Sequence, residues 1–93
     1  MEISFDPAKR ERTLRERGLD FLDAPKVFEA PNYRFLDDRF DYGEEREVVI
    51  GYLRERMVVI VWTSGGSARH IISMRKANDR EQAKYQDHLG RSG

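Results

Sequence analysis

The feature that most constrains the fold is a run of apolar residues at positions 57–63, with the sequence MVVIVWT. The run is far too short to cross a bilayer as a helix, and it has the length of a strand. A strand at the surface of a sheet alternates polar and apolar side chains, whereas this one offers apolar side chains on both sides. The run therefore predicts a central strand that is covered on both faces.

Further strand-like segments lie on either side of this run. They are residues 2–5, 33–36, 46–53 and 69–75. The connections between the last three strands are short, because Arg54 and Glu55 form one tight turn and residues 64–67, SGGS, form another. Short connections join antiparallel neighbours, so we expect an antiparallel meander.

Two helices are predicted before this meander. Asp6 and Pro7 suit the N-cap and the first position of a helix, which we expect from residue 7 to about 17, with its end at Gly18. Asp20 can cap a second helix that ends near residue 30. Within that helix, Pro25 either delays the start or introduces a kink.

A last helix is predicted from residue 79 to about 89, because Asn78 and Glu81 have the spacing of a capping box. Its contact face is small, with Ala83 at best joined by Tyr85 or Leu89. The order β-α-α-β-β-β-β-α predicts an α+β fold, with an antiparallel sheet, two N-terminal helices and one C-terminal helix.

Length and composition narrow the class of protein. The 93 residues are enough for one domain, residues 1–93. The 17 basic and 17 acidic residues cancel, which argues against a bulk polycation but leaves room for a local basic patch. The absence of cysteine excludes disulfides and Cys-ligated zinc, and it fits a reducing cytoplasm. We see no signal peptide and no apolar run of membrane-spanning length.

The familiar catalytic motifs are missing. The sequence contains no P-loop, no GxGxxG after a strand and no HExxH. Two histidines, His70 and His88, cannot form a histidine-rich metal site, and no spacing of acids indicates a calcium loop. We therefore expect no metal ion and no other cofactor.

The segment RHIISMRKA, residues 69–77, is the most unusual, because it combines a strand-like pattern with several cations. In an ideal strand Arg69 and Arg75 share one face, from which two guanidinium groups can bind a phosphodiester, and His70 lies on the other. Both arginines could instead pair with surface acids. His70 could act as a general acid or base near neutral pH, or be a half-buried histidine bonded to a backbone carbonyl.

Other polar and aromatic residues have two readings each. The acid-rich segment 37–47 is a solvated loop by default, but Glu44 and Arg46 lead into a strand that could point them onto the sheet surface. Tyr85 is more often a core residue than a catalyst. Trp62 is expected in the core too, although an indole at a strand end can stack on a base.

Words from nearly the whole chain resemble the BrnT toxins of bacterial type II toxin–antitoxin modules. They are FDPAK (5–9), DYGEER (41–46), HIISMRKA (70–77) and REQAKY (80–85). The resemblance implies a RelE-like fold and a metal-independent endoribonuclease that cleaves RNA and so inhibits translation. Such chemistry needs a base for the 2′-OH, cations for the charge on phosphorus and an acid for the leaving oxygen.

The resemblance also implies which residues form the site. The catalytic candidates are Glu44, Arg46, His70 and Arg75, and the second choices, for substrate binding, are Arg69, Lys76 and Tyr85. Arg75 is the candidate for binding phosphate, and His70 or else Glu44 is the candidate proton carrier. Because ideal alternation places His70 and Arg75 on opposite faces, a bulge or a strand end between them is needed for both to meet one phosphate.

The resemblance implies a partner, a BrnA-like antitoxin with a ribbon-helix-helix fold. The complex of toxin and antitoxin would bind operator DNA only through the antitoxin. The chain departs from the family pattern at Arg17 and Phe40, where many members have histidine. An alternative function is therefore a catalytically weak toxin homologue that acts mainly as a corepressor with its antitoxin. A third is RNA binding without cleavage, which a steep salt dependence and the lack of a cut product would indicate.

Overall fold

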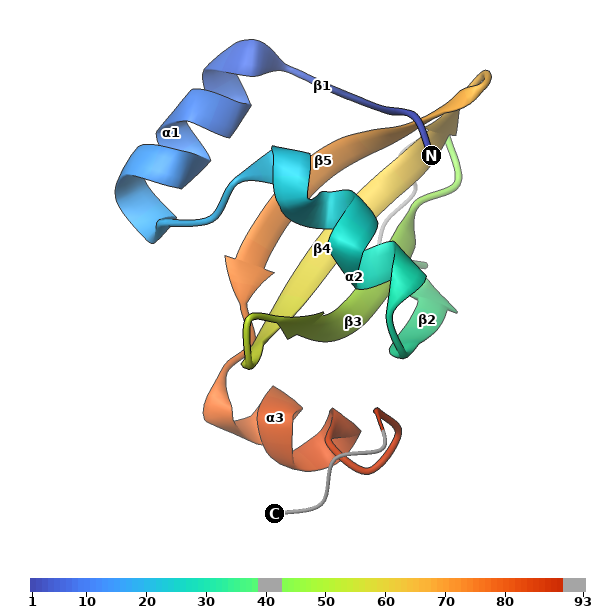
Figure 1. Cartoon of the computed structure of the whole chain (residues 1–93). Helices are drawn as coiled ribbons and strands as arrows, with labels where there is room; N and C mark the ends of the chain where they lie inside the picture. The colour runs from blue at the N-terminus through green and yellow to red at the C-terminus, as the bar shows by residue number, and fades with distance from the viewer. Residues whose placement is uncertain (39–42, 90–93) are drawn as a thin grey trace.

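The computed structural model of the chain describes residues 1–38 and 43–89 (Figure 1). Its strands are β1 (Ile3–Phe5), β2 (Asn32–Leu36), β3 (Glu47–Leu53), β4 (Arg56–Gly65) and β5 (Ala68–Lys76). Its helices are α1 (Pro7–Arg17), α2 (Ala24–Glu29) and α3 (Asp79–Tyr85), and a 3₁₀ turn, η1 (Phe21–Asp23), precedes α2. The strands form one five-stranded sheet in the order β1-β5-β4-β3-β2, and the α+β class predicted from the sequence is confirmed.

The predicted central strand is confirmed as β4, which is covered on both faces. Val58, Ile60 and Trp62 pack in a core with residues of α2, and we call this side of the sheet the α2 face. Met57 and Val59 pack in a second core with residues of α3, and we call this side the α3 face. Each core buries apolar area from a different set of helices, so the sheet is the middle layer of the molecule.

The prediction of a wholly antiparallel sheet is wrong, because β1 pairs with β5 in parallel, with Ser4 opposite His70. The pairs β2–β3, β3–β4 and β4–β5 are antiparallel as expected. A tight turn imposes antiparallel pairing only on strands that follow each other directly. Between β1 and β5 lie two helices and three strands, so no turn fixes their relative direction and the sheet is mixed.

The first helix begins and ends at the predicted residues, whereas the second begins later than its predicted cap. Asp6 accepts a hydrogen bond of 2.9 Å from the backbone N–H of Ala8, and Gly18 ends α1 with a φ of 70°. Asp20 caps the turn η1 rather than a helix, and its pKa lies below its usual value because it accepts side-chain hydrogen bonds from Arg10. Of the two readings of Pro25, the delayed start is the observed one, since α2 begins only at Ala24.

The backbone of β3 lies unusually close to α2. A Cβ atom added at Gly51 would lie 2.8 Å from Cγ1 of Val27, and Val27 is fully buried. No ordinary contact is that short, so the absence of a side chain at position 51 lets the helix sit directly on the strand. This contact fixes α2 over the sheet.

The last helix is shorter than predicted. The capping box of Asn78 and Glu81 is present as expected, but α3 ends at Tyr85 and a turn leads on to Leu89. Tyr85 and Leu89 are both buried, whereas Ala83 is exposed, so the prediction of Ala83 as the main contact is wrong. The burial of a large ring stabilises the docking of a short helix far more than an alanine methyl does.

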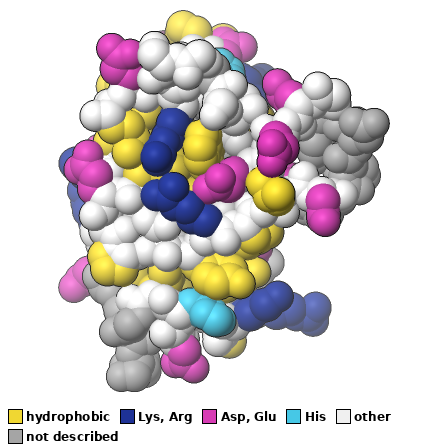
Figure 2. All heavy atoms as spheres, turned by 90° about the vertical axis from the view of Figure 1, so that its right-hand side faces the viewer, with side chains coloured by type: hydrophobic (Ala, Val, Ile, Leu, Met, Phe, Trp, Pro, Cys, Tyr) yellow, Lys and Arg dark blue, Asp and Glu magenta, His cyan; other side chains and the backbone are white. Residues whose placement is uncertain are grey.

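One edge of the sheet carries apolar side chains at the surface. Phe35 and Leu36 of the edge strand β2 are 38% and 56% exposed. Figure 2 views the molecule from the side on which β2 lies in Figure 1, and it shows hydrophobic, basic and acidic side chains next to one another. Because they are consecutive on the strand, Phe35 and Leu36 point to opposite faces of the sheet.

Candidate functional site

A β-bulge interrupts β5 in the middle of the cation-rich segment. Val61 of β4 lies opposite Ser73, but its neighbour Trp62 lies opposite Ile71. Ile72 is therefore the extra residue, with no partner of its own on β4. An extra residue in a strand shifts the alternation of the side chains that follow it.

The bulge brings His70 and Arg75 to the same face of the sheet. His70 lies opposite Thr63 and Arg75 opposite Val59, and Val59 belongs to the core under α3. Because Thr63 and Val59 are an even number of residues apart on a regular stretch of β4, both of their partners lie on the α3 face. The condition for a joint role of His70 and Arg75 is thus met in part. The two side chains lie on the same face of the sheet, but they lie at different positions along β5.

Along the strand the two residues remain apart. Their partners on β4 are four residues apart, which corresponds to roughly 13 Å at about 3.3 Å per residue. That spacing exceeds the size of one phosphate group and suits two different phosphates of one extended nucleic-acid strand. The α3 face therefore carries two separate groups of polar side chains, one around His70 and one around Arg75.

His70 is held by a residue from the other end of the chain. Its Nδ1 lies 2.9 Å from Oγ of Ser4, and the residue is half-buried. The partner is thus a hydroxyl rather than the backbone carbonyl considered above. A bond at Nδ1 orients the ring and makes Nε2 the nitrogen with which an imidazole can exchange a proton with a ligand.

Arg75 pairs with an acid, as its simpler reading predicted. Its Nη1 and Nη2 donate to Oε1 and Oε2 of Glu81, both at 2.8 Å, and these bonds lower the pKa of Glu81 to about 2. The two residues line a groove with a volume of about 390 Å³, whose floor includes Val59 and Val61 and whose wall includes Ser73. The pair fixes the direction of the guanidinium, and the Arg75 side chain as a whole remains 44% exposed.

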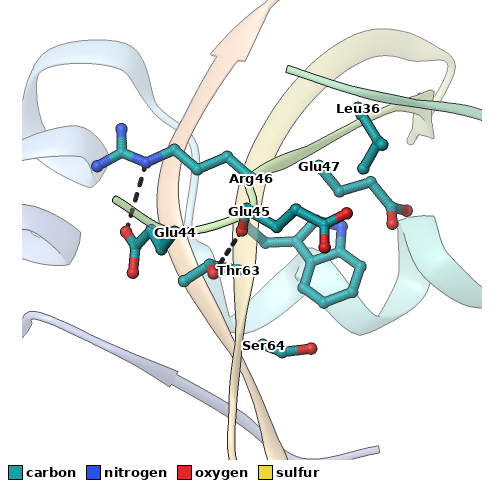
Figure 3. A pocket seen from close by; sticks show the side chains of 8 residues that line it. Leu36, Glu44, Glu45, Arg46, Glu47, Thr63 and Ser64 are labelled. Atoms are coloured by element: carbon teal, nitrogen blue, oxygen red, sulfur yellow. Dashed lines mark hydrogen bonds and ion pairs between the residues drawn. The ribbon is translucent and has the colours of Figure 1, made fainter. Parts of the chain in front are cut away.

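Glu44 and Arg46 lie just before β3, and Figure 3 shows their side chains on the same side, away from that of Glu47. Oε1 of Glu44 is 3.5 Å from Nε of Arg46. Oγ1 of Thr63 donates a hydrogen bond of 2.7 Å to the backbone oxygen of Glu45, and Thr63 is the β4 neighbour of His70. Thr63 thus lies between the Glu44–Arg46 segment and the imidazole, and it joins three of the predicted site residues into one cluster.

The second-choice residues lie in other places. Arg69 is on the α2 face, where its guanidinium stacks 4.5 Å from the ring centre of Phe28 and 4.9 Å from that of Trp62. The expectation that Arg69 and Arg75 share a face is therefore wrong, because it assumed regular alternation through Ile72. Tyr85 is in the core under α3 and only 8% exposed.

Lys76 is exposed near the end of β5, where it lines a shallow pocket together with Arg17 and Arg75. Arg17, one of the two expected departures from the family pattern, donates from Nη1 to the backbone oxygen of Met74 at 2.9 Å. It thereby ties the end of α1 to β5. Phe40, the other departure, lies outside the described residues.

Three contributors to the site were missed at the sequence level. Ser4 gave no signal, because its contact depends on the parallel pairing of β1 with β5. Thr63 was assigned to the central strand, and its register with His70 follows only from the bulge. Glu81 is predicted only as a capping residue. Its carboxylate lies six residues after Arg75 in the sequence, and this spacing is the one sign from which the pairing of Arg75 with Glu81 could be inferred.

The described residues contain neither a cluster of metal ligands nor a membrane-spanning helix. No three histidine, cysteine, aspartate or glutamate side chains within residues 1–38 and 43–89 are grouped so that they could hold a metal ion. Among the helices of the same residues, none combines the length and the apolar character needed to cross a membrane.

A comparison with family models gives one match, to the model described as "Ribonuclease toxin, BrnT, of type II toxin-antitoxin system", over residues 5–81. A comparison with curated proteins gave no match. The matched range runs from the end of β1 into α3, and it contains every site residue named above except Ser4 and Tyr85.

Proposed function

Because the chain belongs to the BrnT family of ribonuclease toxins of type II toxin–antitoxin systems, we propose that it cleaves RNA on the α3 face of its sheet without a metal ion. The observation that carries this proposal is the bulge at Ile72, since it gives His70 and Arg75 the same face as the Glu44–Arg46 cluster. A titratable imidazole, a carboxylate and two guanidinium groups are the groups that metal-free cleavage requires.

In this proposal the scissile phosphate lies at the cluster of Glu44, Arg46 and His70. Arg46 stabilises the negative charge that develops on phosphorus, because a guanidinium matches two phosphate oxygens. His70 exchanges a proton through Nε2, and its bond to Ser4 supports that role by fixing the ring. Glu44 is the alternative proton carrier, and its ion pair with Arg46 supports a position near the same phosphate.

Arg75 then binds a second phosphate farther along the strand. Its separation from His70, roughly 13 Å, favours contact with a phosphate beyond the scissile one. The pair with Glu81 supports this role, because it holds the guanidinium at the groove and leaves part of it exposed. Lys76 and Arg17 extend the cationic surface beyond Arg75.

The test is expression of the chain in bacteria with growth and total RNA followed over time. We expect growth arrest and fragmented RNA, and we expect Arg46→Ala and His70→Ala to slow cleavage by about 100-fold or more. Arg75→Ala should weaken RNA binding more than the chemical step. Arg12→Ala, which removes a charge from an exposed position on α1, is the matched control and should remain toxic. Cleavage by the purified protein should persist in EDTA.

Intact RNA and normal growth at confirmed soluble expression would contradict the proposal. That result would favour the corepressor function, with the loss traced to Arg17 or Phe40. Salt-sensitive RNA binding without a cut product would instead favour RNA binding alone. Loss of cleavage in EDTA that added Mg²⁺ restores would contradict metal independence.

Membership of a type II toxin–antitoxin family implies an antitoxin partner. We propose that this partner is BrnA-like, with a ribbon-helix-helix fold, and that the complex binds operator DNA only through it. We also propose a RelE-like relationship for the fold and action in the cytoplasm. Co-expression with the neighbouring gene product should suppress toxicity and yield a complex that shifts operator DNA, whereas the toxin alone should not shift it.

A further inference from the structure

Glu47 and Trp62 leave two buried polar atoms without hydrogen bonds. They lie directly opposite each other on β3 and β4, so their side chains are neighbours on the α2 face. Among the described residues, neither Nε1 of Trp62 nor Oε1 of Glu47 has a hydrogen-bond partner, and both atoms are buried. Trp62 is 8% exposed. Nη1 of Arg34 lies 3.9 Å from Oε1 of Glu47, a distance that exceeds that of a hydrogen bond.

Both residues line a pocket with a volume of about 260 Å³. A buried donor and a buried carboxylate oxygen are costly to leave without partners, so such atoms in a folded protein generally receive them from water or a ligand. The volume is somewhat below the range of about 300–1,000 Å³ that is usual for sites of larger ligands, and it suits one planar group such as a fused pair of rings. The ligand must offer an acceptor to the indole and donors to the carboxylate.

The charges around the pocket are balanced. Glu44 pairs with Arg46 and Glu47 lies beside Arg34. The carboxylate of Glu45, which also lines the pocket, and the guanidinium of Arg69, which stacks on Trp62, bring the count to three charges of each sign. Figure 3 shows the side chains of Arg46 and Glu47 extending to opposite sides of the strand. In Figure 2, basic, acidic and apolar side chains lie next to one another on this side of the molecule. A neutral polar group flanked by phosphates fits this arrangement better than a free cation or a free anion.

We infer that this pocket binds a guanine base of the RNA substrate. The Watson–Crick edge of guanine carries two neighbouring donors, N1–H and N2–H₂, beside the acceptor O6. A carboxylate such as that of Glu47 can accept from both donors, and the N–H of Trp62 can donate to O6. Adenine and cytosine offer one donor group each, and uracil one N–H between two acceptors, so each satisfies the site less well.

The pocket and the proposed cleavage site share residues. Arg46 and Thr63 line the pocket and also belong to the cluster at His70. Because consecutive residues 46 and 47 point to opposite faces, a nucleotide whose base lies against Glu47 can direct its phosphate around the strand toward Arg46. The inference rests on the proposed RNA cleavage, and it adds the base that such cleavage would select.

The test uses the only tryptophan of the chain as its reporter. Titration of the purified protein with guanosine 5′-monophosphate should change the fluorescence of Trp62 in a saturable way. The monophosphates of adenosine, cytidine and uridine should bind about 5-fold or more weakly. Inosine 5′-monophosphate, which lacks only the N2 amino group, should lie between them. Equal binding of all four common nucleotides, or no saturable change with any, would overturn the inference.

Glu47→Gln provides the second arm, since it keeps the size of the side chain and replaces an acceptor oxygen by a donor. It should remove the preference for the guanosine over the inosine nucleotide while circular dichroism stays unchanged. Glu29→Gln, at an exposed position of α2, is the matched control and should keep the preference. If the protein cleaves RNA but binds all nucleotides alike, the inference fails and the proposed function stands. Guanosine selectivity without RNA cleavage would instead support the pocket and contradict the proposed function.

Discussion

Arg75 and Glu81 form two parallel hydrogen bonds of 2.8 Å, and Oε1 of the same carboxylate also accepts the backbone N–H of Asn78 at 2.9 Å. One carboxylate therefore serves both as the arginine's partner and as half of the capping box of α3. The position of the guanidinium on the sheet and the start of the helix are consequently coupled. A change at Glu81 should affect both the stability of α3 and the orientation of Arg75.

Glu81→Gln should lower the free energy of unfolding at neutral pH by about 1–2 kcal/mol, a value that allows for screening at the partly exposed Arg75. The folded-state pKa of Glu81, about 2, lies below its ordinary value of 4.5, so its charged form stabilises the fold. That contribution is fully present above about pH 4.5 and is lost as the pH falls toward 2. Urea denaturation of both proteins between pH 7 and pH 2 measures the difference.

The difference between Glu81→Gln and the unmodified chain should shrink steadily over that acid range. Glu29→Gln is the control and should follow the unmodified chain at every pH. A difference of constant size from pH 7 to pH 2 would show that the charge of Glu81 contributes nothing to its role.

Gly51→Ala should destabilise the protein by about 1–3 kcal/mol, because the added methyl group would lie 2.8 Å from Cγ1 of Val27. The midpoint temperature of thermal unfolding should fall by several degrees in a chain of this size. The double variant with Val27→Ala should lose less than the sum of the two single variants, since the smaller side chain makes room for the methyl group. Strict additivity would mean that the two residues do not touch in solution.

Glu55→Gly should raise the thermal midpoint. Arg54 and Glu55 connect β3 to β4 with φ values of 51° and 71°, a conformation that is unfavourable for residues with a side chain. Glycine at the second position is the residue that such hairpin turns prefer, and the gain should be about 1 kcal/mol. Glu55→Ala keeps the steric conflict, so it should give no such gain. If both variants shift the midpoint equally, the loss of charge rather than the backbone conformation is the cause.

Ser4→Ala should slow RNA cleavage by about 2- to 10-fold without changing the affinity for RNA, because it removes the hydrogen bond that orients His70. His70→Ala should cost far more. Single-turnover cleavage rates at saturating protein measure the chemical step, and Ser4→Thr, which keeps a hydroxyl, should recover part of the rate. An effect of Ser4→Ala on affinity alone would contradict the orienting role.

Local rules predicted much of this fold. Asp6, Gly18 and the Asn78–Glu81 pair act within one helical turn, so their residue types alone set where helices begin and end. The apolar run at 57–63 predicted a strand buried on both faces, because no other environment suits it. These features depend on neighbours in the sequence, and they are correct to within a residue or two.

The errors that bear on the site concern contacts between distant segments. The parallel pairing of β1 depends on where Ser4 meets His70, and no local pattern specifies that meeting. The bulge at Ile72 carries no glycine or proline as a marker, so regular alternation gave Arg69 the wrong face. The pocket at Glu47 and Trp62 likewise depends on register across two strands. The sequence therefore predicted which residues belong to the candidate site, but not how they are arranged on the two faces of the sheet.

The pairing of β1 with β5 also bears on when the protein becomes active. Ser4 and His70 are 66 positions apart, so the hydrogen bond between them forms only after most of the chain has been synthesised. The first strand waits without a partner until the last strand has left the ribosome. For an enzyme proposed to destroy messenger RNA, this order of assembly delays the damage until the part of the message that encodes β1 to β5 has been translated.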